Sequence, residues 1–170
     1  RANGAASRYE QRLVRTRAAA MEAQQPVAAP VTATTEEAAL DASGLAVAPA
    51  SAPAEVQAII AAGNAIASKP YKYGGGHGRW TDTGYDCSGS ISYALHGAGL
   101  LDTALDSTGF MSWGERGQGT WVSVYANPGH AYMVVAGLRF DTSARRTTGN
   151  RWTDEMRSSS GYTVRHPTGL

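Results

Sequence analysis

The uneven distribution of aromatic residues divides this chain of 170 residues into two parts. Thirteen of the fourteen Phe, Trp and Tyr residues lie at or beyond Tyr71, and Tyr9 is the only earlier one. Aromatic side chains bury large apolar areas, so a core of ordinary size requires the C-terminal two-thirds of the sequence. The length fits one domain, or a smaller domain with a tail, and the aromatic distribution favours the second organisation.

The first 53 residues have the composition of a leader followed by a linker. Residues 5–25 are rich in Ala, Arg, Glu and Gln, which are good helix formers, but their apolar stripe is thin. We predict a solvated, partly helical leader there, with a helix that docks on a partner or an anionic surface as the alternative. Residues 26–54 hold eleven alanines, four prolines and no aromatic residue, which is typical of a disordered linker or a tether. A folded domain is then expected over residues 54–170.

The periodicity of the second part predicts helices followed by strands. Apolar residues recur at helical spacing between Pro53, which suits a first helical turn, and Pro70, which stops the helix. A glycine-rich loop over residues 71–80 leads to a second helix that begins at Cys87. Residues 102–119 look irregular, with two aromatic side chains expected at the surface, Phe110 and Trp113. Alternating patterns then predict strands over residues 120–125, 131–135, 138–142 and 161–166. Helices first and antiparallel strands after them indicate an α+β fold.

Composition and charge argue against several classes of function. The formal net charge of +1 gives no basic field for nucleic acid, and no apolar run approaches the length that spans a bilayer. A single cysteine cannot form an intrachain disulfide or a metal site of paired cysteines, and no two of the four histidines have the i, i+4 spacing of a zinc motif. We therefore expect neither a metal nor a cofactor. The sequence opens on Arg1, so we expect a processed or excerpted product, with any signal peptide upstream.

The single cysteine, Cys87, is a candidate nucleophile. Ser88 and Gly89 allow a tight entry into the following helix, and the positive end of a helix dipole stabilises a thiolate. The alternative is a small buried side chain without reactivity, which is the common state of a free cysteine.

A cysteine nucleophile needs a base and a group that orients the base. His130 opens a predicted strand after a Pro-Gly turn, and the returning strand brings Asp141 roughly opposite it. Each has a structural alternative: His130 as a solvated strand end, and Asp141 as a cap on the next turn. Among the other histidines, His77 could line a cleft from the glycine-rich loop, whereas His96 lies too far along the helix to serve as base. We interpret His166 as structural.

In this order, these residues resemble the NlpC-type family of bacterial cell-wall cysteine peptidases. That family opens its catalytic domain with a Tyr-x-Tyr-Gly-Gly-like segment, then places Asp-Cys-Ser-Gly at a helix start. A Gly-His pair at a strand start and a third polar residue after the hairpin follow. Here the corresponding residues are 71–75, 86–89, 129–130 and 141. The resemblance covers residues 54–142 clearly and the tail to residue 170 loosely.

The resemblance implies a papain-like α+β core and a role for each matched residue. Cys87 is implied to be the nucleophile, His130 the general base and Asp141 the orienting residue, while Tyr71 helps to hold the oxyanion or the cleft wall. Asp86 and Ser88 match positions that contact the free amino end of the substrate in relatives. The full set of residues expected at the substrate cleft is Asp86, Ser88, Tyr73, Gly75, His77 and Trp113.

The implied substrates are peptidoglycan stem peptides, cut at the bond from γ-D-glutamate to a diamino acid, by a secreted or envelope-bound monomer. The sequence departs from the family in three places. Asp141 stands where a histidine is most common, the Pro-Gly-Asp stretch before the catalytic histidine is replaced by residues 120–129, and a Thr-Ser-Gln region is absent around residues 106–109. The alternatives are a related thiol enzyme acting on another substrate, such as an exported toxin amidase or an acyltransferase, and a non-enzymatic wall-binding module.

Overall fold

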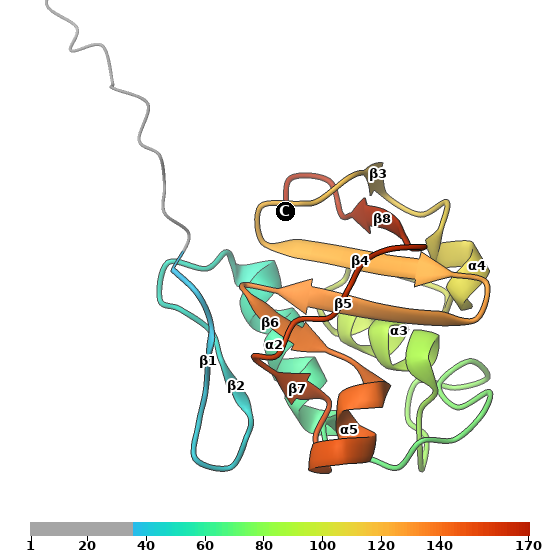
Figure 1. Cartoon of the computed structure of the whole chain (residues 1–170), viewed down its shortest axis with the longest axis horizontal. Helices are drawn as coiled ribbons and strands as arrows, with labels where there is room; N and C mark the ends of the chain where they lie inside the picture. Colours follow the sequence, from blue (N-terminus) through green and yellow to red (C-terminus); the bar gives the residue numbers. More distant parts are fainter. Residues whose placement is uncertain (1–35) are drawn as a thin grey trace, which may run out of the picture. The chain divides into compact units, whose positions relative to one another are not determined.

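The computed structural model describes residues 36–170, so the predicted helical leader and the first part of the predicted linker lie outside the described residues. The described part contains a small hairpin, β1 (Ala39–Leu40) and β2 (Ala46–Val47), and a larger antiparallel sheet, traced in Figure 1. That sheet has the strand order β3-β8-β4-β5-β6-β7. Its strands are β3 (Glu115–Arg116), β4 (Val122–Asn127), β5 (His130–Val135), β6 (Leu138–Phe140), β7 (Trp152–Thr153) and β8 (Thr163–His166).

Two tight turns fix the register of the central strands. Asn127 pairs with His130 across the first turn, and Val135 pairs with Leu138 across the second, so each loop has two residues. In the second loop Ala136 and Gly137 have φ of 45° and 85°, and two positive φ values are what a type I′ hairpin turn requires. This meander brings the start of β5 close to the residue that follows β6.

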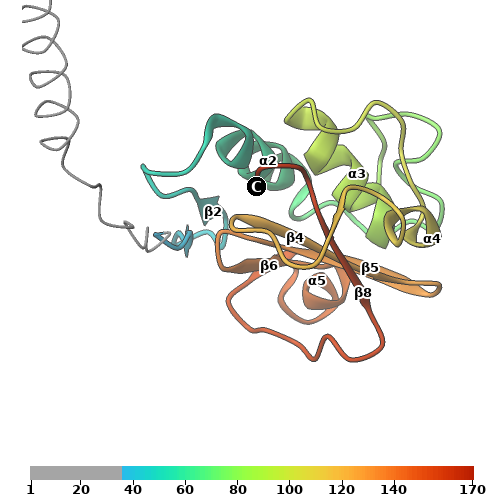
Figure 2. The same cartoon turned by 90° about the horizontal axis from the view of Figure 1, so that it is seen from above.

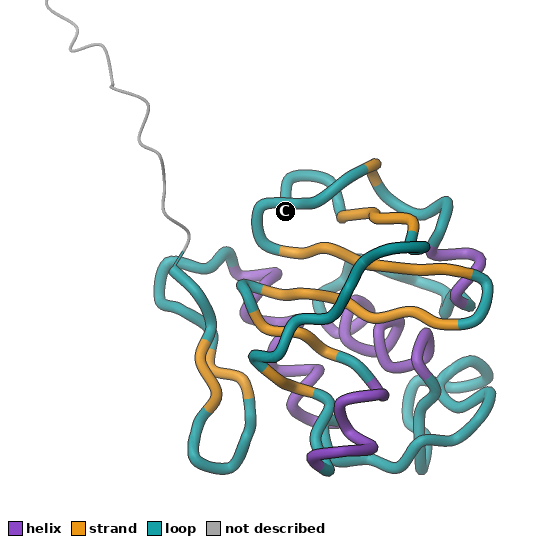
Figure 3. Tube along the Cα trace, viewed as in Figure 1, coloured by secondary structure: helices purple, strands orange, loops and turns teal. Residues whose placement is uncertain are grey.

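Helices cover both faces of the large sheet. Figure 2 shows α2 (Ala54–Ile66) and α3 (Cys87–Gly97) on one side and α5 (Thr142–Thr148) on the other, while Figure 3 shows the long loops between them. The short helix α4 (Ser107–Phe110) packs against β4. Both long helices bury their apolar residues against the sheet, which confirms the predicted helical spacing, and the antiparallel strands confirm the predicted α+β class.

Residues 36–53 differ from the expectation of a linker. The N–H of Ala38 donates to the carbonyl of Ala136, in the turn between β5 and β6, at 2.7 Å. The side-chain amide of Asn64 binds both the N–H and the carbonyl of Ala46. Ala38, Ala46 and Ala52 are all buried. Small alanine side chains suit this segment because they let its backbone approach α2 and the sheet closely. The folded unit therefore starts near residue 36 and not at residue 54.

The structure also bears on the burial of Phe110 and on the length of the apolar helices. The expectation that Phe110 lies at the surface is wrong, because its side chain is fully buried and packs edge-on against Trp113 at 5.7 Å. Among residues 36–170, none of the helices combines the length and apolar character that crossing a bilayer requires.

Candidate active site

The start of α3 holds Cys87 through its neighbour Asp86. The Asp86 carboxylate accepts the N–H of Gly89 at 2.7 Å, as an N-cap residue does, and the N–H of Asp86 donates to the carbonyl of Gly75. A Cβ atom on Gly89 would collide with that carbonyl oxygen, so only glycine lets the loop pack so closely on the helix. Cys87 is thereby the first helical residue, half-buried, at a helix start fixed from two sides.

The imidazole of His130 binds the carboxylate of Asp141. Nε2 of His130 lies 3.0 Å from Oδ1 of Asp141, and the aspartate side chain is fully buried while the histidine side chain remains 23% exposed. Asn127 fixes the turn before the histidine, since its side-chain oxygen accepts the N–H groups of Gly129 and His130. With Nε2 engaged, Nδ1 is the ring nitrogen left for a second partner.

Asp141 has further donors besides the histidine. The N–H of Ser143 donates to Oδ1 at 2.8 Å, and Nη1 of Arg157 donates to Oδ2 at 3.0 Å. Nε of Arg139 is 3.6 Å from Oδ2. The aspartate thus caps α5 and binds the histidine at the same time, so the two roles weighed for it from the sequence coexist.

The pKa values of Cys87 and His130 shift in the directions that favour an ion pair. Burial opposes the thiolate of Cys87, but the neighbouring His130 and the N–H of Ala131 outweigh it and hold the thiol pKa below its usual value. Burial likewise opposes the imidazolium, but the bonds of His130 with Asp141 and Cys87 raise its pKa to about 9. Burial also opposes the charge of Asp141, but His130 and Ser143 keep its pKa well below the ordinary range. The pKa shifts of Cys87 and His130 both favour a thiolate beside an imidazolium over a neutral thiol beside a neutral imidazole.

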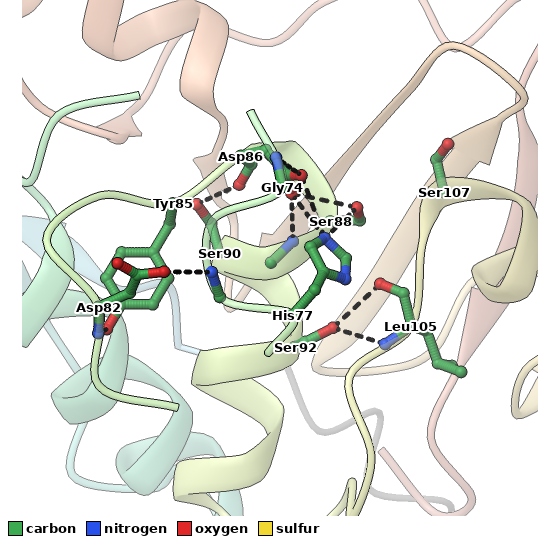
Figure 4. A network of polar contacts seen from close by, with 12 residues as sticks. Gly74, His77, Asp82, Tyr85, Asp86, Ser88, Ser90, Ser92, Leu105 and Ser107 are labelled. Atoms are coloured by element: carbon green, nitrogen blue, oxygen red, sulfur yellow. Dashed lines mark hydrogen bonds and ion pairs between the residues drawn. The ribbon is translucent and has the colours of Figure 1, made fainter. Parts of the chain in front are cut away.

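A second histidine–aspartate pair, His77 and Asp86, lies at the start of α3, as Figure 4 shows. Nε2 of His77 is 3.0 and 3.1 Å from the two oxygens of Asp86, and 3.3 Å from the hydroxyl of Ser88. Asp86 also accepts the N–H of Gly74 at 3.0 Å. The Asp86 carboxylate, which the resemblance assigns to a substrate amine, is therefore already surrounded by donors of the protein.

Two pockets share Tyr71 in their walls, and one is lined by Cys87 while the other is lined by His130. One, of about 360 Å³, is lined by Cys87, His77 and two acidic residues, Asp86 and Asp106; we call it the acidic pocket. The other, of about 370 Å³, is lined by Tyr71, His130, Thr142, Ser143, Arg145 and Arg146; we call it the arginine pocket.

The remaining residues predicted for the cleft fall in different places. Tyr71 lines both pockets, and burial together with the charges of Cys87 and Asp86 raises its pKa. Tyr73 also lines the acidic pocket but is 91% exposed. Gly75 is buried, and its carbonyl supports the start of α3. Trp113 lines neither pocket and packs against the core beside Phe110.

Sequence reasoning missed the role of Arg151. Its side chain is fully buried, and it donates to the hydroxyl of Ser90 at 3.0 Å and to the carbonyl of Tyr85 at 3.1 Å. Nη1 donates to the carbonyls of Ile66 and Lys69 at 2.7 and 2.6 Å. Burial lowers the pKa of this guanidinium to about 10. No local pattern marks Arg151, because the segments that it joins lie far apart in the sequence.

Comparison with known proteins adds no assignment to this geometry. No protein-family model matches the sequence, and none of the curated proteins does either. Within residues 36–170, no three His, Cys, Asp or Glu side chains gather in a way that could hold a metal ion.

Proposed function

We propose that this protein is a cysteine peptidase of the bacterial envelope that hydrolyses peptidoglycan stem peptides, related to the NlpC-type family and its papain-like arrangement of helix and sheet. The observation that carries the proposal is the half-buried thiol at the start of α3, beside a histidine whose other nitrogen binds the buried Asp141. The start of α3 supplies the thiol, and the β5–β6 hairpin brings His130 and Asp141 together. In this proposal the three residues are the nucleophile, the base and the orienting group that thiol acyl transfer requires.

The proposed reaction proceeds through an acyl-enzyme. The Cys87 thiolate attacks the amide carbonyl carbon, and the carbonyl electron pair moves onto the oxygen. In this proposal the donors to that oxygen are the N–H of Cys87, in the first helical turn, and the hydroxyl of Tyr71, which lines the same pocket. His130 then gives its proton to the amine as the C–N bond breaks, which leaves a thioester on Cys87. Water attacks the thioester, His130 takes the proton of that water, and the acid product and the thiolate are released.

The first experiment compares wild type with Cys87→Ala on purified sacculi and on the tripeptide L-alanyl-γ-D-glutamyl-L-lysine. We expect wild type to release muropeptides and free lysine, and the variant to release neither. Cys87→Ser is the matched control, because it keeps a hydroxyl of similar size but not a thiolate at neutral pH. Equal release by wild type and Cys87→Ala would overturn the role of the cysteine.

The neighbourhood of Asp86 favours one alternative substrate class. Since His77, Ser88 and Gly74 already donate to this carboxylate, it is less available to a cationic amine than the family resemblance implies. A thiol amidase or acyltransferase acting on a substrate without a free amine fits that feature. The same tripeptide with an acetylated N-terminus separates the two readings: a strong loss of cleavage on acetylation favours the stem peptidase, and equal cleavage favours the alternative. A non-enzymatic module would cleave neither peptide.

A further inference from the structure

The proposed chemistry indicates which part of the substrate each pocket would hold. In thiol acyl transfer the acid that protonates the leaving amine must lie on the leaving-group side of the scissile bond. His130 lines the arginine pocket and not the acidic pocket, whereas Cys87 lines the acidic pocket. The acyl part of the substrate therefore extends into the acidic pocket, and the amine part extends into the arginine pocket.

The charges of the two pockets are opposite. Arg145 and Arg146 line the arginine pocket, and no carboxylate does, while Asp86 and Asp106 line the acidic pocket. Asp141 lies close to His130 but is neutralised by His130 and Arg157. An anionic group in the arginine pocket thus meets two guanidinium groups and no competing carboxylate of the wall.

Hydrogen bonds hold the guanidinium group of Arg145 in place but use only some of its N–H groups. Its Nε and Nη2 both donate to the carbonyl of Ser68, at 3.3 and 3.2 Å, and in the described part of the chain Nη1 has no hydrogen-bond partner. A guanidinium anchored on one edge presents the other edge in a defined direction, which suits a carboxylate. Thr142 and Ser143 line the same pocket.

We propose that the arginine pocket is a leaving-group subsite that selects substrates whose departing amine carries a carboxylate, with Arg145 and Arg146 as its specificity-determining residues. This inference rests on the proposed thiol peptidase function. The carboxylate is one attached to the residue after the cleaved bond, as in an amino acid released with a free carboxyl group.

The test compares two tripeptides that differ in this carboxylate alone: L-alanyl-γ-D-glutamyl-L-lysine and its C-terminal carboxamide. We expect wild type to prefer the carboxylate by about tenfold in kcat/KM, since hydrogen bonds to charged groups outweigh neutral ones. The double variant Arg145→Gln/Arg146→Gln should reduce that preference to less than about twofold. Arg116→Gln, in the exposed strand β3 at the far edge of the sheet, is the charge-matched control and should keep the wild-type preference. The rate of Cys87 alkylation by iodoacetamide shows whether the double variant retains its fold and nucleophile.

Each outcome bears on a separate claim. Equal cleavage of the two peptides by wild type, or a preference that persists in the double variant, would overturn the subsite and leave the peptidase intact. If wild type cleaves neither peptide, the proposed substrate is wrong, and the subsite is then judged by alkylation of Cys87 with anionic iodoacetate against neutral iodoacetamide. We expect the ratio of these two rates to fall about threefold or more in the double variant, because the local anion attraction is lost. An unchanged ratio would overturn the subsite.

Discussion

Two histidine–aspartate pairs lie near the same cysteine, and they differ in what surrounds the carboxylate. In each pair Nε2 of the histidine lies 3.0 Å from an aspartate oxygen. Asp141 is fully buried and backed by arginine side chains, whereas Asp86 caps α3 and binds backbone N–H groups. The second arrangement uses the carboxylate of Asp86 to form a helix start. Under the proposed function, the first arrangement leaves Asp141 to orient His130 and to stabilise its positive charge, so the two pairs would have different roles.

The strongest test of this difference replaces each histidine by glutamine. His130→Gln should lower kcat/KM for the tripeptide by about 10³-fold or more, because the proton donor and the partner of the thiolate are both lost. His77→Gln should change it by less than about tenfold, since the cysteine keeps its partner. Steady-state kinetics measure both, and alkylation of Cys87 at pH 7 should slow only in His130→Gln. Losses of similar size in the two variants would remove the distinction between the pairs.

The carboxylates are compared next, through Asp141→Asn and Asp86→Asn. Asp141→Asn should lower kcat by about 10²- to 10³-fold, because the amide cannot stabilise the imidazolium. Asp86→Asn should lower kcat by less than about tenfold, since asparagine is itself a good N-cap residue. Thermal unfolding of both variants controls for loss of fold. A larger kcat loss for Asp86→Asn would place the chemistry on the other pair.

The pH dependence of kcat/KM tests whether Asp141 controls the pKa of His130. In wild type the imidazolium of His130 is present up to its pKa of about 9, so kcat/KM should fall on the alkaline side near that pH. Loss of the Asp141 charge removes the larger of the two influences that raise the pKa of His130, so the alkaline limb of Asp141→Asn should move to lower pH. His77→Gln serves as the control and should keep the wild-type limb. If the alkaline limb of kcat/KM lies at the same pH in Asp141→Asn as in wild type, the proposed pairing of His130 with Asp141 in catalysis is contradicted.

The smallest effect on activity is expected from replacing Arg157, which donates a hydrogen bond to Asp141. Arg157 donates to Asp141 and lies over the rings of Tyr132 and Tyr162, with its side chain 32% exposed. Arg157→Gln should lower kcat less than about fivefold and the Tm by about 2–5 °C, because a partly exposed ion pair contributes little. Arg116→Gln is again the charge-matched control, measured by kinetics and thermal unfolding. A loss as large as that of Asp141→Asn would show that the arginine does more than support the carboxylate.

The sequence predicts local features well and long-range ones only in part. Period-two alternation and the Ala136-Gly137 turn place the central hairpin, and that hairpin brings Asp141 back to His130. The His77–Asp86 pair could not be predicted, because it forms only after the glycine-rich loop folds onto the start of α3. Nor does composition predict a folded segment before residue 54, since alanine-rich chains are usually read as linkers. Here the side chain of Asn64 supplies the hydrogen bonds that hold Ala46 in place.

The buried guanidinium of Arg151 has a consequence for the order in which the domain is made. Its partners precede it by 61 to 85 residues, and they include the segments on both sides of the loop that leads to Cys87. We infer that during synthesis Cys87 emerges from the ribosome well before Arg151, whose hydrogen bonds hold the loop before Cys87 in place. Pulse alkylation of stalled nascent chains would show it: chains that end before Arg151 should react as an ordinary thiol does. The surroundings of Cys87 would then be completed only near the end of synthesis.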